Sequence, residues 1–113
     1  MGGNRIGFCL DTCHAYSAGY DVSDEEGLRN MLRQLGKIIG FGRLKLVHLN
    51  DSVGVLGSGV DHHEHIGMGN IGEDGFRRIL SSRLAKKPMI LETPVDERRS
   101  DAENMIKVLE LAG

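Results

Sequence analysis

The chain has 113 residues, which is enough for one hydrophobic core of ordinary size and leaves little room for a second domain. Hydrophobic residues make up 40% of it and charged residues 27%, a balance that excludes an intrinsically disordered chain. Fourteen Lys and Arg against sixteen Asp and Glu give a net charge of −2, so no overall basic field indicates a nucleic-acid partner.

The first half of the chain predicts a strand, a helix and a second strand. Ile6–Leu10 is a short apolar run and indicates a buried strand. Ser23 and Glu26 are spaced as a capping box, and apolar residues then recur at helical spacing until Gly40. Residues 44–49 form a second apolar run. The first strand and the helix therefore form one βα unit, and the second strand begins another.

The second half repeats this alternation. Residues 50–72 contain many glycines and predict a long loop, and a shorter apolar stripe around 76–80 predicts a helix. Residues 89–91 predict a third strand. Ser100 and Glu103 form another capping box, which begins the final helix.

Strands that alternate with helices predict an α/β protein with a parallel sheet. We interpret residues 1–113 as a partial TIM-type (β/α) barrel, namely its last three βα units, because a whole barrel of this type takes about 250 residues. Side chains alternate along a strand, so Leu10, Val47 and Leu91 are expected to face the helices. The open sheet edges predict association, either with a missing N-terminal half or with a second copy of the chain.

Six side chains of metal-binding type lie at or after the ends of the predicted strands. They are Asp11, His14, His48, Asp61, His63 and Glu92. Alone, each has an ordinary structural explanation, since aspartate is common in turns and a single histidine is often buried and hydrogen-bonded. Together, imidazole and carboxylate form the ligand set of zinc and related metals. The sequence therefore predicts a metal site where the strands end.

Two other motifs bear on the interpretation as a metal site. The segment DHHEH leaves open which histidine binds, and no H-E-x-x-H spacing indicates a helix-borne protease site. Gly67, Gly69 and Gly72 match G-x-G-x-x-G, and Glu92 follows twenty positions later, as in a dinucleotide-binding fingerprint. That fingerprint requires a preceding strand, whereas here a polar stretch precedes it. We interpret the glycines as a tight loop that holds the ligands.

The remaining features concern the cellular compartment. Cys9 and Cys13 are too few and too close to form a disulfide framework, and their C-x-x-x-C spacing favours small buried side chains over ligands. No apolar stretch approaches the roughly 20 residues that span a bilayer, and the start MGGNRIGF has no signal-peptide pattern. We expect a cytoplasmic protein with no membrane partner.

Four ordered segments, CLDTCHAYSAGYD, VHLNDS, GSGVDHHEHIGMGNIG and LETP, resemble the signatures of the endonuclease IV family of apurinic/apyrimidinic endonucleases. The resemblance runs from about Ile6 to the last helix. It implies a zinc-dependent DNA repair enzyme on a β/α barrel, which acts on DNA containing abasic sites. Such an enzyme cleaves the phosphodiester on the 5′ side of the abasic site with a metal-activated water.

The resemblance also implies a role for each candidate ligand. In that family three zinc ions share nine ligands, and six of these positions carry the expected residue type here. Asp11 and His48 correspond to ligands of the second zinc. His14, Asp61 and His63 correspond to ligands of the third. Glu92 matches the glutamate beside the attacking water and the second zinc.

Some features of the family pattern are absent from this sequence. The two histidines of the first zinc and its bridging glutamate belong to earlier strands. We therefore expect the chain to bind at most about two zinc ions and to have little nicking activity by itself. His62 stands where relatives often have arginine, and Met68 where a polar residue is usual, so contacts with DNA near this loop are expected to differ.

Two alternatives remain open. One is a sugar isomerase on a similar barrel, with carboxylate-rich manganese or magnesium sites, although the three histidines favour zinc. The other is a truncated or split zinc-binding module that has no catalytic activity on its own.

Overall fold

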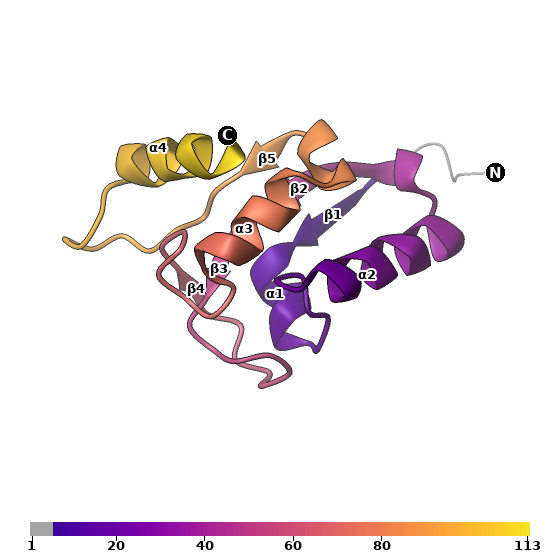
Figure 1. The fold of residues 1–113 in the computed structure, drawn as a ribbon, viewed down its shortest axis with the longest axis horizontal. Helices are drawn as coiled ribbons and strands as arrows, with labels where there is room; N and C mark the ends of the chain where they lie inside the picture. Colours follow the sequence, from indigo (N-terminus) through magenta and orange to yellow (C-terminus); the bar gives the residue numbers. More distant parts are fainter. Residues whose placement is uncertain (1–5) are drawn as a thin grey trace.

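The computed structural model of the chain describes residues 6–113. The first five residues of the segment MGGNRIGF, for which we expected no signal peptide, lie outside the described residues. Three parallel strands, β1 (Phe8–Asp11), β2 (Leu44–His48) and β5 (Met89–Ile90), form a sheet in the order β1-β2-β5 (Figure 1). This confirms the predicted α/β class with a parallel sheet.

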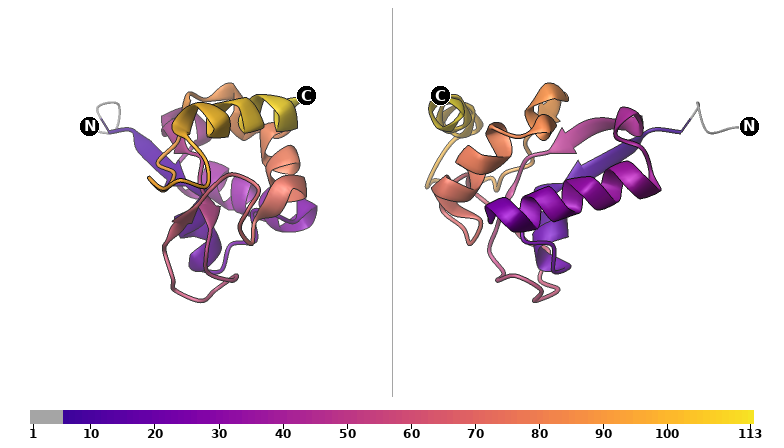
Figure 2. Two further views of the ribbon diagram at one scale, coloured as in Figure 1. Left: turned by 90° about the vertical axis from the view of Figure 1, so that its left-hand side faces the viewer. Right: turned by 45° about the vertical axis from the view of Figure 1, so that its right-hand side comes forward.

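Four helices and two short 3-10 turns connect and follow these strands. They are α1 (Thr12–Ser17), α2 (Glu25–Ile38), η2 (Phe41–Arg43), α3 (Gly72–Leu80), η3 (Arg83–Lys86) and α4 (Asp101–Ala112). Figures 1 and 2 show α2 and α3 covering one face of the sheet, with α4 at the opposite end of the molecule from the start of β1. None of the helices within residues 6–113 is long and apolar enough to cross a membrane.

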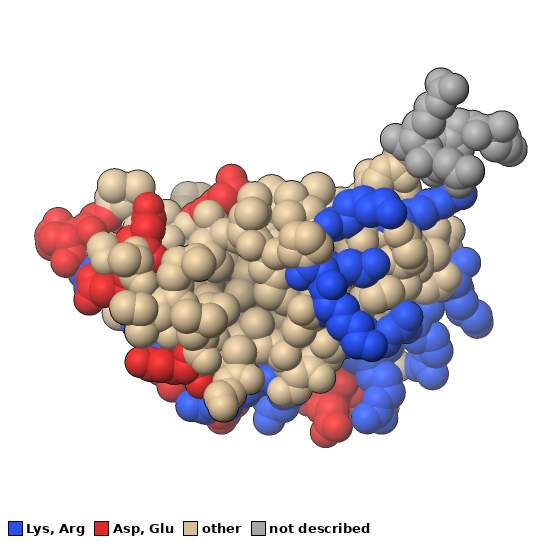
Figure 3. Space-filling view, turned by 90° about the horizontal axis from the view of Figure 1, so that it is seen from above, with Lys and Arg blue, Asp and Glu red and all other residues tan. Residues whose placement is uncertain are grey.

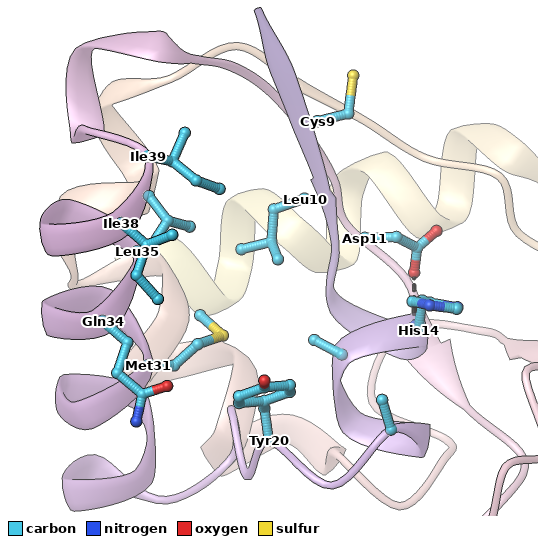
Figure 4. Close-up of a pocket in the computed structure, with 12 residues that line it drawn as sticks. Cys9, Leu10, Asp11, His14, Tyr20, Met31, Gln34, Leu35, Ile38 and Ile39 are labelled. Carbon is cyan, nitrogen blue, oxygen red and sulfur yellow. Dashed lines mark hydrogen bonds between the residues drawn. The ribbon is translucent and has the colours of Figure 1, made fainter.

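One core joins this face of the sheet to the helices. Val47 of β2 is fully buried and packs in the same cluster as Leu28 of α2 and Phe76 of α3. Leu10 and Leu91 pack against that cluster, so the predicted alternation of side chains is confirmed. Figure 4 shows Leu10 directed towards α2 across an apolar groove of about 340 Å³, with Cys9 pointing the other way. By alternation, the opposite face of the strands carries Cys9 and Leu46 and, at the strand ends, Asp11 and His48.

The starts of the helices were only partly predicted. Asp24, not Ser23, caps α2, because its carboxylate accepts from the backbone N–H of Gly27, whereas the Ser23 hydroxyl donates to Asp21. The six-residue α1 was not predicted at all; its cap is Asp11, which accepts from the backbone N–H of His14. The capping box that begins α4 is confirmed.

The region predicted as one long loop contains a small antiparallel sheet. Its strands are β3 (Asp51–Ser52) and β4 (His63–Glu64). The fully buried carboxylate of Asp51 accepts from the backbone N–H groups of Gly67, Gly69 and Ile71 at 2.9–3.0 Å. One side chain thus holds the glycine-rich loop closed on itself, which agrees with its interpretation as a tight structural loop.

Candidate metal centre

The candidate ligands come together because parallel strands end at the same edge of a sheet. Asp11 is the last residue of β1 and His48 the last of β2, and the two are direct partners in the strand register. His48 in turn lies opposite Ile90 of β5, and Glu92 follows two residues later. Three of the six predicted residues therefore line one edge of the sheet.

The other three reach this edge from α1 and from β4 and the loop before it. His14 lies on the first turn of α1, directly after β1. His63 is in β4, and Asp61 lies two residues before it. Hairpin pairing of β4 with β3, which follows β2 almost at once, brings this segment back over the strand ends.

Each of the six side chains contacts another of the six. Nδ1 of His14 lies 3.0 Å from Oδ2 of Asp61. Nδ1 of His48 lies 2.6 Å from Oε1 of Glu92. Nε2 of His63 lies 3.4 Å from Oδ2 of Asp11. The structure thus gathers the predicted residues into one cluster, and their role as metal ligands stays a prediction.

Two sets of donor atoms within this cluster are close enough to hold an ion. Asp11, His48 and Glu92 form one set, with all donor atoms within 4.8 Å of one another. Asp11, Cys13, Asp61 and His63 form the other, within the same limit. Asp11 belongs to both, so the arrangement is compatible with neighbouring ions that share one carboxylate. Imidazole nitrogen and carboxylate oxygen are donors that suit zinc.

Paired charges set the protonation of the exposed part of the cluster. The hydrogen bond to Asp61 raises the pKa of His14, and the same contact with His14 lowers the pKa of Asp61. The pair therefore favours an imidazolium and a carboxylate. A cation bound by both side chains displaces the proton of His14, because metal ligation requires the neutral ring.

Cys13 is a member of the second set that the sequence did not predict. Its thiol is fully buried and donates to the backbone carbonyl of His62 at 3.4 Å. Burial raises the pKa of Cys13 to about 12. Through this hydrogen bond the thiol supports the loop that carries His62, next to Asp61. Cys9, which we expected to be buried, is exposed.

Asn50 is the second residue that sequence reasoning missed. Its side-chain amide donates to Oδ2 of Asp11 at 3.2 Å, and its carbonyl oxygen accepts from the backbone N–H of Glu92 at 2.8 Å. The side chain is fully buried, and the backbone of Asn50 exchanges hydrogen bonds with the Thr12 hydroxyl. Its place two residues after His48, directly behind a strand, is a signal that could have identified it.

The three histidines of the segment DHHEH have different environments. His63 contacts Asp11, and its Nδ1 lies 2.8 Å from the backbone carbonyl oxygen of Glu92. His62 is exposed at the rim of an open hollow of about 350 Å³ that Asp61, His63 and Glu92 also line. His65 is fully buried, with its ring nitrogens 2.9 Å from Asp96 and 2.9 Å from Asn104. His63 is the one of the three that the cluster includes.

The sequence matches a known family over almost its whole length. A family model described as xylose isomerase-like TIM barrel matches residues 2–111. The chain belongs to this family. Its fold is correspondingly similar to the crystal structure of endonuclease IV from Thermus thermophilus, with a TM-score of 0.71 and 47% identity. That match covers 91% of this chain and 36% of the other.

The similarity to individual curated proteins narrows the family assignment. The chain is 57% identical over 110 residues to a probable endonuclease 4 of Methanoculleus marisnigri. It is 46% identical over 109 residues to a probable endonuclease 4 of Nitrosopumilus maritimus. Both matches cover 96% of this chain and 39% of the relative, so the chain spans about two fifths of their length. Within the barrel family the chain is a member of the endonuclease IV group.

Proposed function

We propose that this chain forms part of a zinc-dependent endonuclease that hydrolyses the DNA phosphodiester 5′ of an abasic site. The observation that supports the proposal is the clustering of Asp11, His14, His48, Asp61, His63 and Glu92 at the C-terminal ends of the parallel strands. Catalytic groups of β/α barrels lie at this end. The relatives carry the name endonuclease 4, and the cluster supplies donor groups of the type that bind catalytic metal ions.

The proposed ligands divide between the two sets of donor atoms. His48 with Glu92 would hold one cation and Asp61 with His63 another, with Asp11 a member of both sets. His14 belongs to neither set and would join the second through its contact with Asp61. A bound divalent cation polarises a phosphoryl oxygen and lowers the pKa of water to roughly 7. By their family positions, two zinc ions are the most that this set of residues is expected to hold.

The chain's own residues would orient the reacting groups. Glu92 lies on the rim of the open hollow, where its carboxylate can accept a hydrogen bond from an attacking water. The backbone N–H of Glu92 is held by buried Asn50, which limits the movement of this residue. His62 lies at the same rim, exposed, where a DNA phosphate can reach it. DNA without a base is also easier to distort, because an abasic nucleotide loses little stacking when it is extruded.

A chimera tests the proposal. Residues 6–113 would replace the matching segment of the Thermus thermophilus endonuclease IV, and nicking of a duplex with one abasic site would be measured. We expect chelator-sensitive cleavage on the 5′ side, reduced at least about 100-fold by Glu92→Gln. The matched control Glu97→Gln, which removes an exposed carboxylate outside both sets of donor atoms, should retain most of the activity. A chimera that folds and binds zinc but does not nick abasic DNA would refute the proposal.

The sugar isomerase alternative predicts a different outcome. Carboxylate-rich sites for manganese or magnesium need fewer histidines than the three gathered here. We therefore expect no interconversion of pentoses or hexoses by the chimera with either metal. Isomerisation in the absence of nicking would favour the alternative.

A further inference from the structure

The chain carries its charges unevenly along the sequence. No Asp or Glu occurs between Glu26 and Asp51, and none between Asp74 and Glu92. Both acid-free segments contain the start of a strand of the parallel sheet, namely β2 and β5. Uncompensated positive charge is therefore expected at the N-terminal end of the sheet, opposite the candidate metal centre.

The fold brings these two segments together. β2 and β5 are parallel neighbours, and the backbone N–H of Val47 donates to the carbonyl of Pro88, so η2 and η3 lie side by side before them. The ring of Phe41 in η2 receives the guanidinium of Arg83 at 4.1 Å and the ammonium of Lys87 at 4.5 Å. These cation–π contacts hold two charges of the second segment against the first.

Five cations make up the surface that we call the basic face. They are Arg43, Lys45, Arg83, Lys86 and Lys87. Four are exposed and Lys87 is half-buried. Figure 3 shows Lys and Arg side chains forming a band on the right-hand half of the molecule, while Asp and Glu gather towards the left-hand end, where α4 lies in Figure 1.

The basic face is not neutralised within the part of the chain that the structure describes. Arg77, Arg98 and Lys107 each form ion pairs with carboxylates, whereas the five cations of the basic face form none among residues 6–113. The rest of the chain contains nine Lys and Arg residues and sixteen Asp and Glu residues. A positive surface thus persists on a protein whose net charge is negative.

The face has the composition of a surface that binds nucleic acid. Protein interfaces usually contain a core of exposed apolar side chains, and none of the large exposed apolar residues of the described chain falls within 41–45 or 83–88. A phosphate backbone needs no such core, because affinity comes from the release of counterions by Lys and Arg. The cations are spread over two segments rather than directed into one pocket, which suits a ligand with regularly spaced charges.

We propose that the basic face docks the phosphate backbone of intact nucleic acid, separately from the metal centre. The two sites lie towards opposite ends of β2: Lys45 is its second residue and His48 its last, three residues or about 10 Å apart at 3.3 Å per residue. A duplex held at the basic face therefore does not need an abasic site or a metal ion. The inference goes beyond the proposed function and does not depend on catalysis.

Binding of a fluorescein-labelled intact DNA duplex to the full chain, measured by anisotropy in EDTA at several salt concentrations, tests this proposal. The triple variant Arg83→Gln/Lys86→Gln/Lys87→Gln removes three charges of the basic face. We expect it to bind at least about tenfold more weakly and to show a log K against log salt slope lower by about 2.7. The charge-conserving Lys86→Arg/Lys87→Arg variant should bind like the unchanged chain.

The control variant Arg29→Gln/Arg77→Gln/Lys107→Gln removes the same charge from cations that already pair with carboxylates. We expect a change of less than about twofold in affinity. Equal losses in both triple variants would contradict the proposal, as would stronger binding of anionic vesicles or poly-glutamate than of DNA. EDTA and intact DNA keep this result independent of the metal centre, and circular dichroism checks that each variant is folded.

Discussion

The side-chain amide of Asn50 donates a hydrogen bond to Oδ2 of Asp11 over 3.2 Å. Asn50 is buried, and its side-chain oxygen Oδ1 accepts a hydrogen bond from the backbone N–H of Glu92. The side-chain amide therefore cannot rotate without losing its contacts with both Asp11 and Glu92. One side chain thus fixes Asp11, which ends the first strand of the sheet, and Glu92, which follows the third. Partners behind metal ligands commonly tune affinity in this way.

Asn50→Ala should weaken metal binding more than its effect on folding explains. We expect zinc affinity to fall about 10- to 100-fold and the free energy of unfolding to fall by about 1–3 kcal/mol. The control is Asn104→Ala, which removes an equally buried asparagine that bonds to His65 and Ile66, away from the cluster. It should lower stability by a similar amount and leave zinc affinity unchanged. Equal losses of affinity in the two variants, measured by competition with a chelating dye, would show that Asn50 has no special role.

Two glycines should respond to alanine in opposite directions. A Cβ at Gly69 would lie 2.4 Å from the carbonyl oxygen of Ser52 and 2.6 Å from Oδ1 of Asp51, so the closed loop must shift. Gly69→Ala should destabilise the fold by about 1–3 kcal/mol. Gly36 lies within α2, where an added Cβ would meet nothing within 4 Å, and Gly36→Ala should stabilise by up to about 1 kcal/mol. Urea unfolding midpoints that move in the same direction would contradict this account.

The attachment of the segment before α4 should depend on pH through Asp96. Hydrogen bonds from Arg98 and from His65 hold the pKa of this carboxyl well below its usual range. A carboxyl whose pKa is lower in the folded than in the unfolded state raises the free energy of unfolding at every pH above its unfolded pKa of about 3.9. This contribution is lost as the pH falls from that value towards the folded pKa. Asp96→Asn should therefore melt at a lower temperature than the unchanged chain at pH 6, with the difference shrinking below about pH 4.

Glu97→Gln is the matched control for this titration, since Glu97 is the next residue and forms no ion pair among residues 6–113. Its melting temperature should follow that of the unchanged chain at every pH. A constant difference between Asp96→Asn and the unchanged chain from about pH 6 to about pH 2 would mean that Asp96 does not contribute through its charge.

The parts of the fold set by hydrophobic periodicity were predictable from the sequence. The runs that end at Leu10 and Leu49 gave the parallel strands, and the Ser100 capping box gave the start of α4. Helix α1 was missed because six residues are too few to show a helical period, and its cap Asp11 resembles an ordinary turn residue. The cap of α2 was placed one residue early because Ser23 and Asp24 both suit that position.

The site residues that lie at strand ends were predictable from the sequence, whereas those that join the site through tertiary contacts were not. Asp11, His48 and Glu92 follow from the rule that parallel strands end at one edge. The choice of His63 over His62 and His65 came from the family resemblance. The contact of His63 with Asp11 depends on the pairing of β3 with β4. Strands of two residues are too short to be recognised in a sequence. Cys13 contributes through a hydrogen bond to the carbonyl of His62, far along the chain, and no local pattern encodes this contact. The place of Asn50 just after β2 is a local signal, but its partners Asp11 and Glu92 are determined by the fold.

Zinc content shows directly whether the six side chains at one edge of the sheet hold metal ions. The chain would be saturated with zinc, passed through gel filtration and analysed for metal, beside His14→Ala/His48→Ala/His63→Ala and the control His62→Ala. We predict about one to two zinc ions per chain for the unchanged protein and for the control, and none for the triple variant. A triple variant that is folded and retains as much zinc as the unchanged chain would refute metal binding at this edge of the sheet.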